Sequence, residues 1–490
     1  MIRKELFLLL VILAIASFSR LWQLDSIPPG LYPDVALNGN EALHSLKTGD
    51  FKVFYPENNG REGLMMWLIA GSFSIFGVSV WSIKIVAALA GIFTVLGLYL
   101  LTKELFAKYA ENTSRYIALL SSFFLATSFW HTNFSRIGFR AILLPLISVF
   151  AFYFLFRAFR IKKLRDFIFS GIFFGLGFYT YTSYRMIILL FPLMLICLPF
   201  FKKDKKMLSV IGSWLLVIFV VALPLGIYFL QNPQDFMSRM TGVSIFAQTN
   251  PLLAFGKSLI AHLGMFNFYG DANWRHNFSG SPMLPWSLGV LFLIGVISSI
   301  KKIFLAIKTK NHQHLMTPIF LTSWFFVMLL PGVLTYEGIP HALRVVGVIP
   351  VVYIFVALGS WWLYEKLKQF VKNKRLLSVI GYFLLVLIGY SEFNKYFFVW
   401  AKNPNVQGAF TTNYVEIGNQ LNSLPENVQK YVIVNEGGTP VPYPDGTPMP
   451  AQTPMFIERI KFDEPRATYL LPEDLNKIQN PEKAIIIFLR

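Results

Sequence analysis

Long apolar stretches recur along the chain and set the limits on its fold. Hydrophobic residues make up 55% of the 490 residues, charged residues only 14%, and the mean hydropathy is +0.53. A soluble domain carries about 25% charged residues. Because lipid offers no partner for backbone polar groups, apolar runs of about 20 residues predict helices. A β-barrel would instead show short strands of alternating polarity. The sequence therefore predicts an all-α polytopic membrane protein.

About eleven membrane spans are expected. They cover roughly residues 5–24, 81–102, 116–133, 138–157, 167–182, 186–201, 208–230, 284–300, 315–335, 345–364 and 376–398. The first resembles a signal peptide, but its apolar run continues to Leu24, which favours an uncleaved span. The stretch 64–78 is short and is expected to form a re-entrant or interfacial helix.

Basic residues cluster in alternate loops and predict the orientation. The clusters lie at 3–4, 103–115, 157–165, 202–206, 301–310 and 366–375. The positive-inside rule makes this side, with the N-terminus, cytoplasmic, in a multi-pass protein of the cytoplasmic membrane. The first outer loop 25–63, the second large outer loop 231–283 and the loop 336–344 then face outward. The net charge of +18 reports this orientation, so nucleic-acid binding is not expected.

The chain changes character after Lys402 and divides into two predicted parts. Residues 403–490 are polar and rich in Pro, Asn and Glu, with strand-like runs at 431–434 and 484–488. We expect a membrane domain at 1–402 and a small extracytoplasmic α/β domain at 403–490. The single cysteine, Cys197, excludes an internal disulfide and a cysteine metal site.

The first outer loop carries the main candidate for chemistry. Residues 38–48 have apolar side chains at helical spacing and end at Gly49, so we expect an amphipathic helix along the membrane surface. Asp34 lies just before it. A partly desolvated carboxylate can act as a general base on an acceptor hydroxyl or amine. A helix cap or a solvated side chain is the alternative for Asp34.

Three arginines near the ends of predicted helices are candidates for binding an anion such as phosphate. Arg61 either pairs with the adjacent Glu62 or binds phosphate in bidentate fashion. Arg136 lies at the outer end of a span, where charges usually extend to the interface. Arg344 begins an apolar run and needs an anion, which either Glu337 or a lipid phosphate supplies.

The loop GDANWRHNFSGSP is a candidate substrate-contact loop. It contains Asp271, Trp274, Arg275 and His276, and Trp274 is available for stacking against a sugar. His262, Asp271 and His276 do not have a standard zinc spacing, so no metal site is predicted. A divalent metal cofactor is possible but is not required by the sequence.

The run PPGLYPD-x-A-x-x-G-x-x-A-L-x-x-L-x-TGDF…NNGREGL resembles the first outer loop of the GT-C glycosyltransferases. The nearest branch is the superfamily of protein O-mannosyltransferases and aminoarabinose–lipid A transferases. Three later stretches also resemble it: Phe134–Arg136 with Arg140, Gly270–Asp271 with Arg275–Asn277, and Pro340–His341 with Arg344. The resemblance covers about 400 residues and is most specific in the first loop.

The resemblance implies an inverting transferase with a polyprenyl-phosphate sugar donor and a lipid, glycan or protein acceptor. Counting back from Gly49-Asp50 places Asp34 at the proposed catalytic base. Where the family has a following Glu, this chain has Val35, so Glu41 is the substitute candidate. The donor phosphate is expected at Arg61, Arg344 and Arg136. The expected substrate contacts are Glu62, Asp271, Trp274, Arg275, His276 and His341.

Three other functions stay open at this point. A transporter or flippase would place polar sites near the membrane midplane and show paired repeats, whereas most candidates here cluster at one face. A glycan polymerase or ligase has a similar architecture with a different donor. A membrane scaffold would only display the C-terminal domain.

Overall fold

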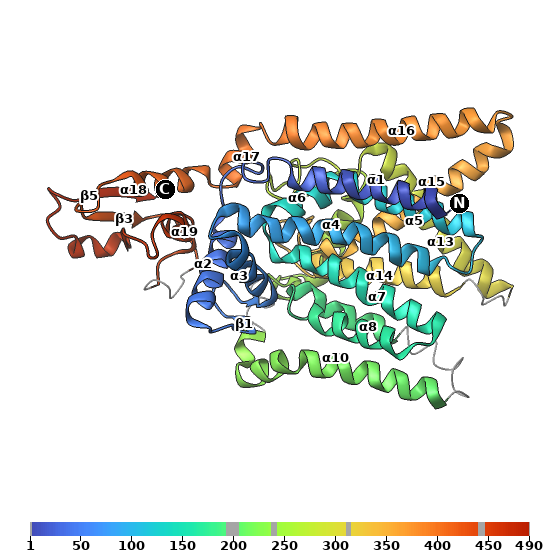
Figure 1. Cartoon of the computed structure of the whole chain (residues 1–490), viewed down its shortest axis with the longest axis horizontal. Coiled ribbons are helices and arrows are strands. Elements are labelled where there is room, and N and C mark those ends of the chain that lie inside the picture. The colour runs from blue at the N-terminus through green and yellow to red at the C-terminus, as the bar shows by residue number, and fades with distance from the viewer. Residues whose placement is uncertain (1, 193–204, 237–242, 310–314, 440–445, 490) are drawn as a thin grey trace.

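A computed structural model describes residues 2–192, 205–236, 243–309, 315–439 and 446–489. Most of the chain forms a bundle of long helices that run side by side (Figure 1). The N-terminus lies at one end of this bundle, and the C-terminal segment extends from the opposite end. The polytopic all-α membrane architecture predicted from the sequence is confirmed.

The bundle is built from helices of very different length. They are α1 (Ile2–Leu21), α4 (Val80–Leu105), α5 (Glu111–Thr127), α6 (Phe129–Ile137), α7 (Leu143–Ile161), α8 (Leu164–Gly177), α10 (Lys205–Gln231), α12 (Pro251–Gly264), α13 (Trp286–Lys308), α14 (Met316–Val333), α15 (Ile349–Phe370) and α16 (Lys374–Asn394). Helix α16 continues into a π-helical turn, Lys395–Trp400, and α10 and α16 lie at opposite edges of the bundle (Figure 1).

Seven helices in the described ranges are long and apolar enough to cross a membrane. The expected count was eleven, and it stays a prediction. Helices α5 and α8, with 17 and 14 residues, are shorter than a standard span. The expected span 186–201 begins in a 3-10 helix, Thr182–Leu190, and then runs into residues outside the described ranges. The stretch expected as a short interfacial helix forms α3 (Leu64–Phe76).

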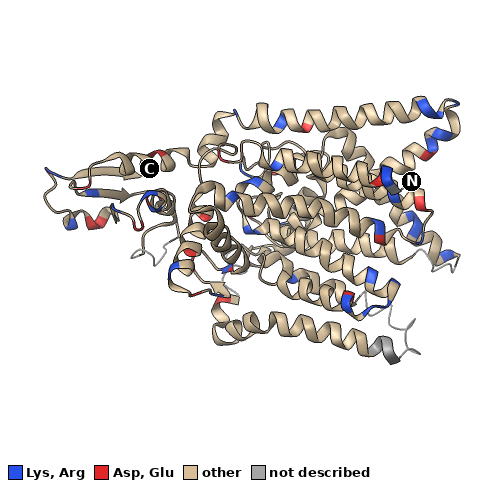
Figure 2. Ribbon diagram, viewed as in Figure 1, with Lys and Arg blue, Asp and Glu red and all other residues tan. Residues whose placement is uncertain are grey.

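Lysine and arginine residues gather at the end of the bundle opposite the C-terminal segment (Figure 2). The other end carries the first loop, including α2 (Pro33–Thr48) and α3, and then the C-terminal segment (Figure 1). The candidate site residues of the first loop therefore lie at the end that is poorer in these basic clusters.

Helix α2 contains the expected helix 38–48 but begins five residues earlier, at Pro33, so that Asp34 lies inside it. Pro33 occupies its first turn, and Gly49 ends it in the left-handed conformation with φ 77°. Its predicted place on the membrane surface is wrong, because most of its residues are buried between α3 and helix α19 (Gln452–Lys461). Gly39 permits this packing, since a Cβ there would lie 2.6 Å from Ile83 and 2.8 Å from Phe456.

The C-terminal segment forms a small parallel sheet with helices. Strands β3 (Lys430–Val434), β4 (Thr468–Leu470) and β5 (Ile485–Leu489) pair in the order β4-β3-β5. Both predicted strand runs are present as β3 and β5. Helices α17 (Pro404–Ala409), α18 (Thr412–Ser423) and α19 accompany the sheet.

Helix α19 docks on α2 through a buried polar junction. Asn40 Nδ2 donates to the main-chain oxygen of Gln452 at 3.1 Å and to its side-chain oxygen at 2.9 Å. Arg459 donates to Asn40 Oδ1 at 3.0 Å, so one asparagine satisfies two residues of α19. The same helix that carries Asp34 is therefore held by the C-terminal segment.

Candidate active site

Asp34 lies in the first turn of α2, at the end of the bundle that faces the C-terminal segment. It lines a mainly polar pocket of about 370 Å³. One side of the pocket is formed by the start of α2 and by Asn58, and the other by residues of the C-terminal segment. The remaining lining residues are Tyr32, Pro33, Thr411, Tyr414, Glu436, Gly437, Gly438, Thr439, Met449 and Pro450.

Asn58 fixes the carboxylate of Asp34. Its side-chain amide donates a hydrogen bond to Asp34 Oδ1. Asn58 belongs to a tight turn in which Asn58, Asn59 and Gly60 all have positive φ, between 54° and 85°. Asn and Gly tolerate this conformation best, and the sequence Asn-Asn-Gly is a turn signal. Sequence reasoning did not select Asn58, although this turn signal is visible in the chain.

Arg61 is committed to the first loop itself. It is fully buried, and it contacts Glu41 at 3.3 Å, Glu57 at 3.8 Å and Asn38 at 3.0 Å. Burial lowers the pKa of Arg61, and Glu41 opposes this shift. Burial likewise raises the pKa of Glu41, against the effect of Arg61. The predicted alternative of a pair with Glu62 is not formed.

Glu62 instead pairs with Arg140 across the bundle. Arg140 Nε lies 3.0 Å from Glu62 Oε2, and Thr182 donates to Glu62 Oε1 at 2.9 Å. Burial raises the pKa of Glu62, but Arg140 and Arg185 outweigh it and the net pKa is lowered. Residues Arg61–Glu62 form strand β2, which pairs with β1 (Phe54–Tyr55), so the hairpin directs the two charges to different partners.

Arg136 is a structural clamp for the chain that follows α1. Its guanidinium donates to four main-chain carbonyls, those of Ser19, Trp22, Gln23 and Ile27, at 2.8 to 3.2 Å. The side chain has no exposed surface. The structure therefore does not bring Arg136 together with Asp34 in an open site.

Arg344 is paired with Glu337, one of the two anions that the sequence suggested as its partner. Its guanidinium donates to Thr335 Oγ1 at 2.9 Å and to the carbonyl of Glu337 at 2.7 Å, and it lies 3.4 Å from the Glu337 carboxylate. Glu337 is largely exposed, and a pair with an exposed carboxylate is worth little. Arg344 can therefore exchange this partner for another anion.

Arg275, from the 231–283 loop, lies against the ring of Tyr32 at the start of α2. Its guanidinium carbon lies 3.9 Å from the centre of the Tyr32 ring, two residues before Asp34. Within the described ranges the guanidinium has no carboxylate partner, and its Nε is buried without a hydrogen bond. The main chain of the residue is held, since Asn133 donates to its carbonyl at 2.7 Å. A fixed, unpaired guanidinium is a binding group for an anion.

Trp274 contributes packing beside Arg275. Its ring lies 5.0 Å from that of Phe278, and its carbonyl accepts a hydrogen bond from Trp400 Nε1 at 3.0 Å. It remains partly exposed. The predicted role in sugar stacking stays a prediction.

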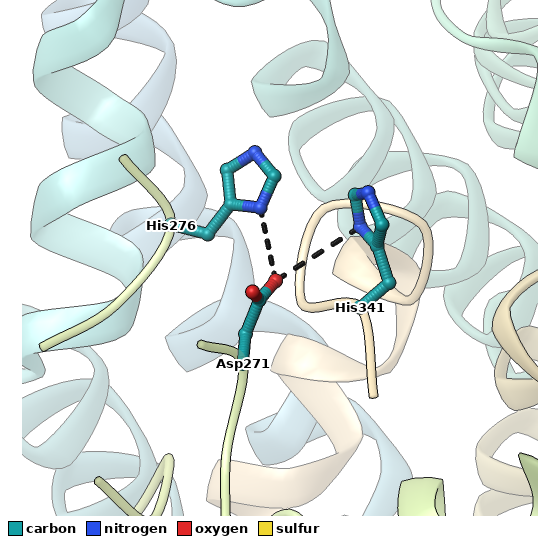
Figure 3. Close-up of side chains that lie close together, drawn as sticks. All are labelled: Asp271, His276 and His341. Carbon is teal, nitrogen blue, oxygen red and sulfur yellow. Dashed lines mark hydrogen bonds and ion pairs between the residues drawn. The ribbon is translucent and has the colours of Figure 1, made fainter. Parts of the chain in front are cut away.

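Asp271, His276 and His341 converge on one point (Figure 3). His276 Nδ1 lies 2.9 Å and His341 Nδ1 4.0 Å from Asp271 Oδ2. His262, which the sequence offered with Asp271 and His276, instead accepts a hydrogen bond from the main-chain nitrogen of His341 at 3.2 Å. The loop that contains Asp271 and His276 thus lies against the segment of His341. The third residue of the cluster is His341 and not His262.

Comparisons with known proteins find a family match and solved structures of similar architecture. Residues 64–228 match the family described as dolichyl-phosphate-mannose-protein mannosyltransferase. No curated protein sequence matches significantly. The structure of ArnT from Cupriavidus metallidurans bound to undecaprenyl phosphate is 12% identical with a TM-score of 0.55, over 99% of this chain and 92% of that one.

The archaeal oligosaccharyltransferase AglB from Archaeoglobus fulgidus, in complex with an inhibitory peptide and a dolichol-phosphate, is a second structural neighbour. It is 12% identical with a TM-score of 0.51, over 87% of this chain and 62% of that one. At these identities the likeness shows the fold. The family match spans residues 64–228 of the 490 and, together with this fold, supports the resemblance predicted from the first loop to the GT-C glycosyltransferases of the protein O-mannosyltransferase and ArnT superfamily.

Proposed function

We propose that the protein is a glycosyltransferase that moves a sugar from a polyprenyl-phosphate donor to an acceptor on the outer face of the cytoplasmic membrane. One observation carries the proposal. The Asp34 carboxylate, oriented by Asn58, lines a pocket, and an unpaired guanidinium, that of Arg275, lies on the neighbouring Tyr32 ring. A base and an anion-binding group thus stand close to each other at one end of the bundle.

Asp34 is the proposed general base. It removes the proton from an acceptor hydroxyl or amine, and the freed electron pair forms the bond to the anomeric carbon. The bond from that carbon to the phosphate oxygen breaks, and the pair leaves with the polyprenyl phosphate. Attack from the face opposite the leaving group inverts the anomeric centre. Glu41 is the less suitable base, because Arg61 already occupies its carboxylate.

The donor phosphate is assigned to Arg275, with Arg344 as a second contact. A guanidinium offers phosphate two parallel hydrogen bonds and offsets the charge that develops on the leaving group. Arg61 and Arg136 have buried partners that a phosphate would have to displace. Their proposed role is therefore to hold the first loop and the turn after α1, with no direct contact to the donor.

The pocket between Asp34 and the C-terminal segment is the proposed acceptor side. Its described lining includes the carboxylates of Asp34 and Glu436 and the rings of Tyr32 and Tyr414, without a basic side chain. The donor tail would lie against the apolar helices of the bundle. The nature of the acceptor, whether lipid, glycan or protein, is left to experiment.

The orientation follows from charge. Lysine and arginine gather at the end of the bundle away from Asp34, which favours a cytoplasmic position for that end (Figure 2). Nucleotide sugars are absent outside, so a lipid would have to carry the activated sugar. The two neighbouring structures support this class of donor, since ArnT is bound to undecaprenyl phosphate and AglB to a dolichol-phosphate. A further AglB structure is tethered to an acceptor peptide, which supports an acceptor site in this fold.

A transfer assay on purified protein in lipid tests the proposal. Radiolabelled polyprenyl-phosphate sugars are supplied as a mixture with total cell-envelope acceptors, and Asp34→Asn is compared with Asp50→Asn. Asp50 is an exposed carboxylate of the same loop and serves as the matched control. Label that moves with wild type and Asp50→Asn, and not with Asp34→Asn, supports the proposal. Equal transfer by both variants would remove Asp34 as the base.

A further inference from the structure

Two histidine nitrogens and one carboxylate oxygen converge beside the proposed donor site. The candidate ligand atoms of Asp271, His276 and His341 all lie within 4.8 Å of one another (Figure 3). The residues come from two segments that are 65 positions or more apart, the 271–277 loop and the segment before α15. Asp271 and His276 are buried, and His341 is partly buried.

One histidine is hydrogen-bonded to the carboxylate, whereas Nδ1 of the other accepts from the main-chain nitrogen of Arg344 at 3.4 Å. His276 Nδ1 is 2.9 Å from Asp271 Oδ2 and can donate to it. His341 Nδ1 points to the same oxygen from 4.0 Å, which is too far for a hydrogen bond (Figure 3). In a tetrahedral zinc site, ligands about 2.0–2.1 Å from the metal are about 3.3 Å apart. The two observed separations lie on either side of this value.

Main-chain hydrogen bonds orient the carboxylate of Asp271. The main-chain nitrogen of Ala342 donates to Asp271 Oδ2 at 2.7 Å, and that of Asn273 donates to Oδ1 at 2.8 Å. Oδ2 is thus held by Ala342 while it contacts His276 Nδ1. Metal sites are usually supported by such hydrogen bonds to the ligating groups.

The histidines are positioned as well. The His276 ring is 5.8 Å from the ring of Phe134 and 6.3 Å from that of Phe139. The main-chain nitrogen of His341 donates to His262 Nε2 at 3.2 Å. An apolar wall and a held main chain reduce the freedom of both imidazoles, so the three donor atoms are arranged before any ion arrives.

We propose that Asp271, His276 and His341 form a binding site for a divalent transition-metal ion, zinc in the first place. Two imidazoles and one carboxylate match the ligands of zinc sites that keep a fourth position open. Imidazole nitrogen disfavours magnesium and calcium, which prefer oxygen ligands. The fourth position would hold water or an oxygen of a bound anion.

The ion would join the two segments that carry the two arginines assigned to the donor phosphate. Arg275 directly precedes His276, and Arg344 follows His341 by three residues. Binding of the ion would therefore fix the spacing of both guanidinium groups. This positional role rests on the proposed function, whereas metal binding itself does not and is measured without any sugar transfer.

Metal content of tag-free protein is the direct test. Purified wild type is exposed to zinc, passed through a desalting column and analysed by inductively coupled plasma mass spectrometry. The expected result is about one zinc per chain for wild type and for His44→Ala, in which an exposed histidine on α2 is removed. His276→Ala and His341→Ala are expected to lose at least nine tenths of the zinc. A chelator should lower the thermal midpoint of wild type, and added zinc should restore it.

A gain of signal guards against variants that fail to fold. In protein loaded with cobalt, His276→Cys should add a thiolate-to-cobalt absorption band that His44→Cys lacks. The proposal is overturned if wild type retains less than about 0.2 zinc ions per chain and the chelator does not change its thermal midpoint. It is equally overturned if His44→Ala loses as much zinc as His276→Ala, which would mean an adventitious ion only. If wild type binds zinc but transfers no sugar, the result would contradict the proposed function and leave the metal site standing.

Discussion

The guanidinium carbon of Arg275 lies 3.9 Å from the centre of the Tyr32 ring, and Tyr32 stands two residues before Asp34. Burial and the Asp34 carboxylate raise the pKa of the Tyr32 hydroxyl, while Arg275 opposes them. The 231–283 loop thus supplies a cation that lies on the ring beside the start of α2, the helix that carries Asp34. The account of donor binding depends on this contact.

Arg275→Ala is expected to weaken binding of polyprenyl phosphate. A hydrogen bond to a charged group contributes about 1.5–3 kcal/mol, which corresponds to roughly a 10- to 150-fold rise in Kd. Arg275→Lys should fall in between, because lysine keeps the charge and loses the bidentate geometry. Kd is measured with labelled polyprenyl phosphate in nanodiscs. Arg165→Ala, an exposed arginine far from Asp34 in the sequence, is the control; an unchanged Kd for Arg275→Ala would refute the assignment.

Arg61→Ala is expected to act on stability. Removing one member of a buried ion pair costs about 3–5 kcal/mol, because the partner charge, here chiefly Glu41, stays buried. The midpoint of thermal unfolding should fall clearly. The double variant Arg61→Met/Glu41→Leu should recover part of the loss. If Arg61→Ala unfolds like wild type but binds polyprenyl phosphate poorly, Arg61 contacts the donor after all.

Glu458 predicts a pH dependence for the C-terminal segment. Burial raises its pKa, and the side chain accepts hydrogen bonds from Tyr469 and from the main-chain nitrogens of Arg466 and Ala467. Because the folded state holds the proton more tightly, its stabilising contribution is complete below the unfolded value of about 4.3. The contribution is lost as pH rises through the raised pKa.

Glu458→Gln should remove this dependence, since glutamine keeps the hydrogen-bonding shape without the charge. The difference in thermal midpoint, variant minus wild type, is measured between pH 4 and pH 8. It should shift in favour of the variant as pH rises. A difference that stays constant over this range, or that moves the other way, would contradict the assignment.

Asn40→Ala should loosen the C-terminal segment from α2. The change removes three buried hydrogen bonds, two to Gln452 and one from Arg459, and a lost buried hydrogen bond costs about 1–3 kcal/mol. Limited proteolysis should then cut faster near residues 403–411, and transfer should fall while polyprenyl-phosphate binding is kept. Asn405→Ala, at an exposed asparagine of α17, is the control. Equal cutting rates for both variants would show that this junction does not hold the segment.

Local sequence signals predicted the elements that local forces determine. Gly49 ends α2 because a residue without a side chain tolerates φ 77°, and the β-branched runs of the C-terminal segment form β3 and β5. The start of α2 did not follow, because the helix was expected from residue 38 and begins at Pro33, so that Asp34 lies in its first turn. The surroundings of α2 did not follow, because its polar residues meet α19 from more than 400 positions away.

The partners of the charged residues could not be predicted for the same reason. Glu62 finds Arg140, 78 positions later, and Asp271 approaches His341, 70 positions later. Hydropathy identifies apolar runs, but it does not indicate whether a helix is surrounded by other helices or by lipid. The short helices α5 and α8 therefore did not stand out from full spans in the sequence.

The central claim, that Asp34 acts in chemistry and not in donor binding, is tested most directly by measuring both in one variant. For Asp34→Asn with a donor that wild type transfers, we expect a Kd for polyprenyl phosphate within about twofold of wild type. The rate of transfer should fall by about 10²–10⁴, the usual contribution of a general base. Transfer at the wild-type rate, or a loss of donor binding that accounts for the whole fall in rate, would contradict the account.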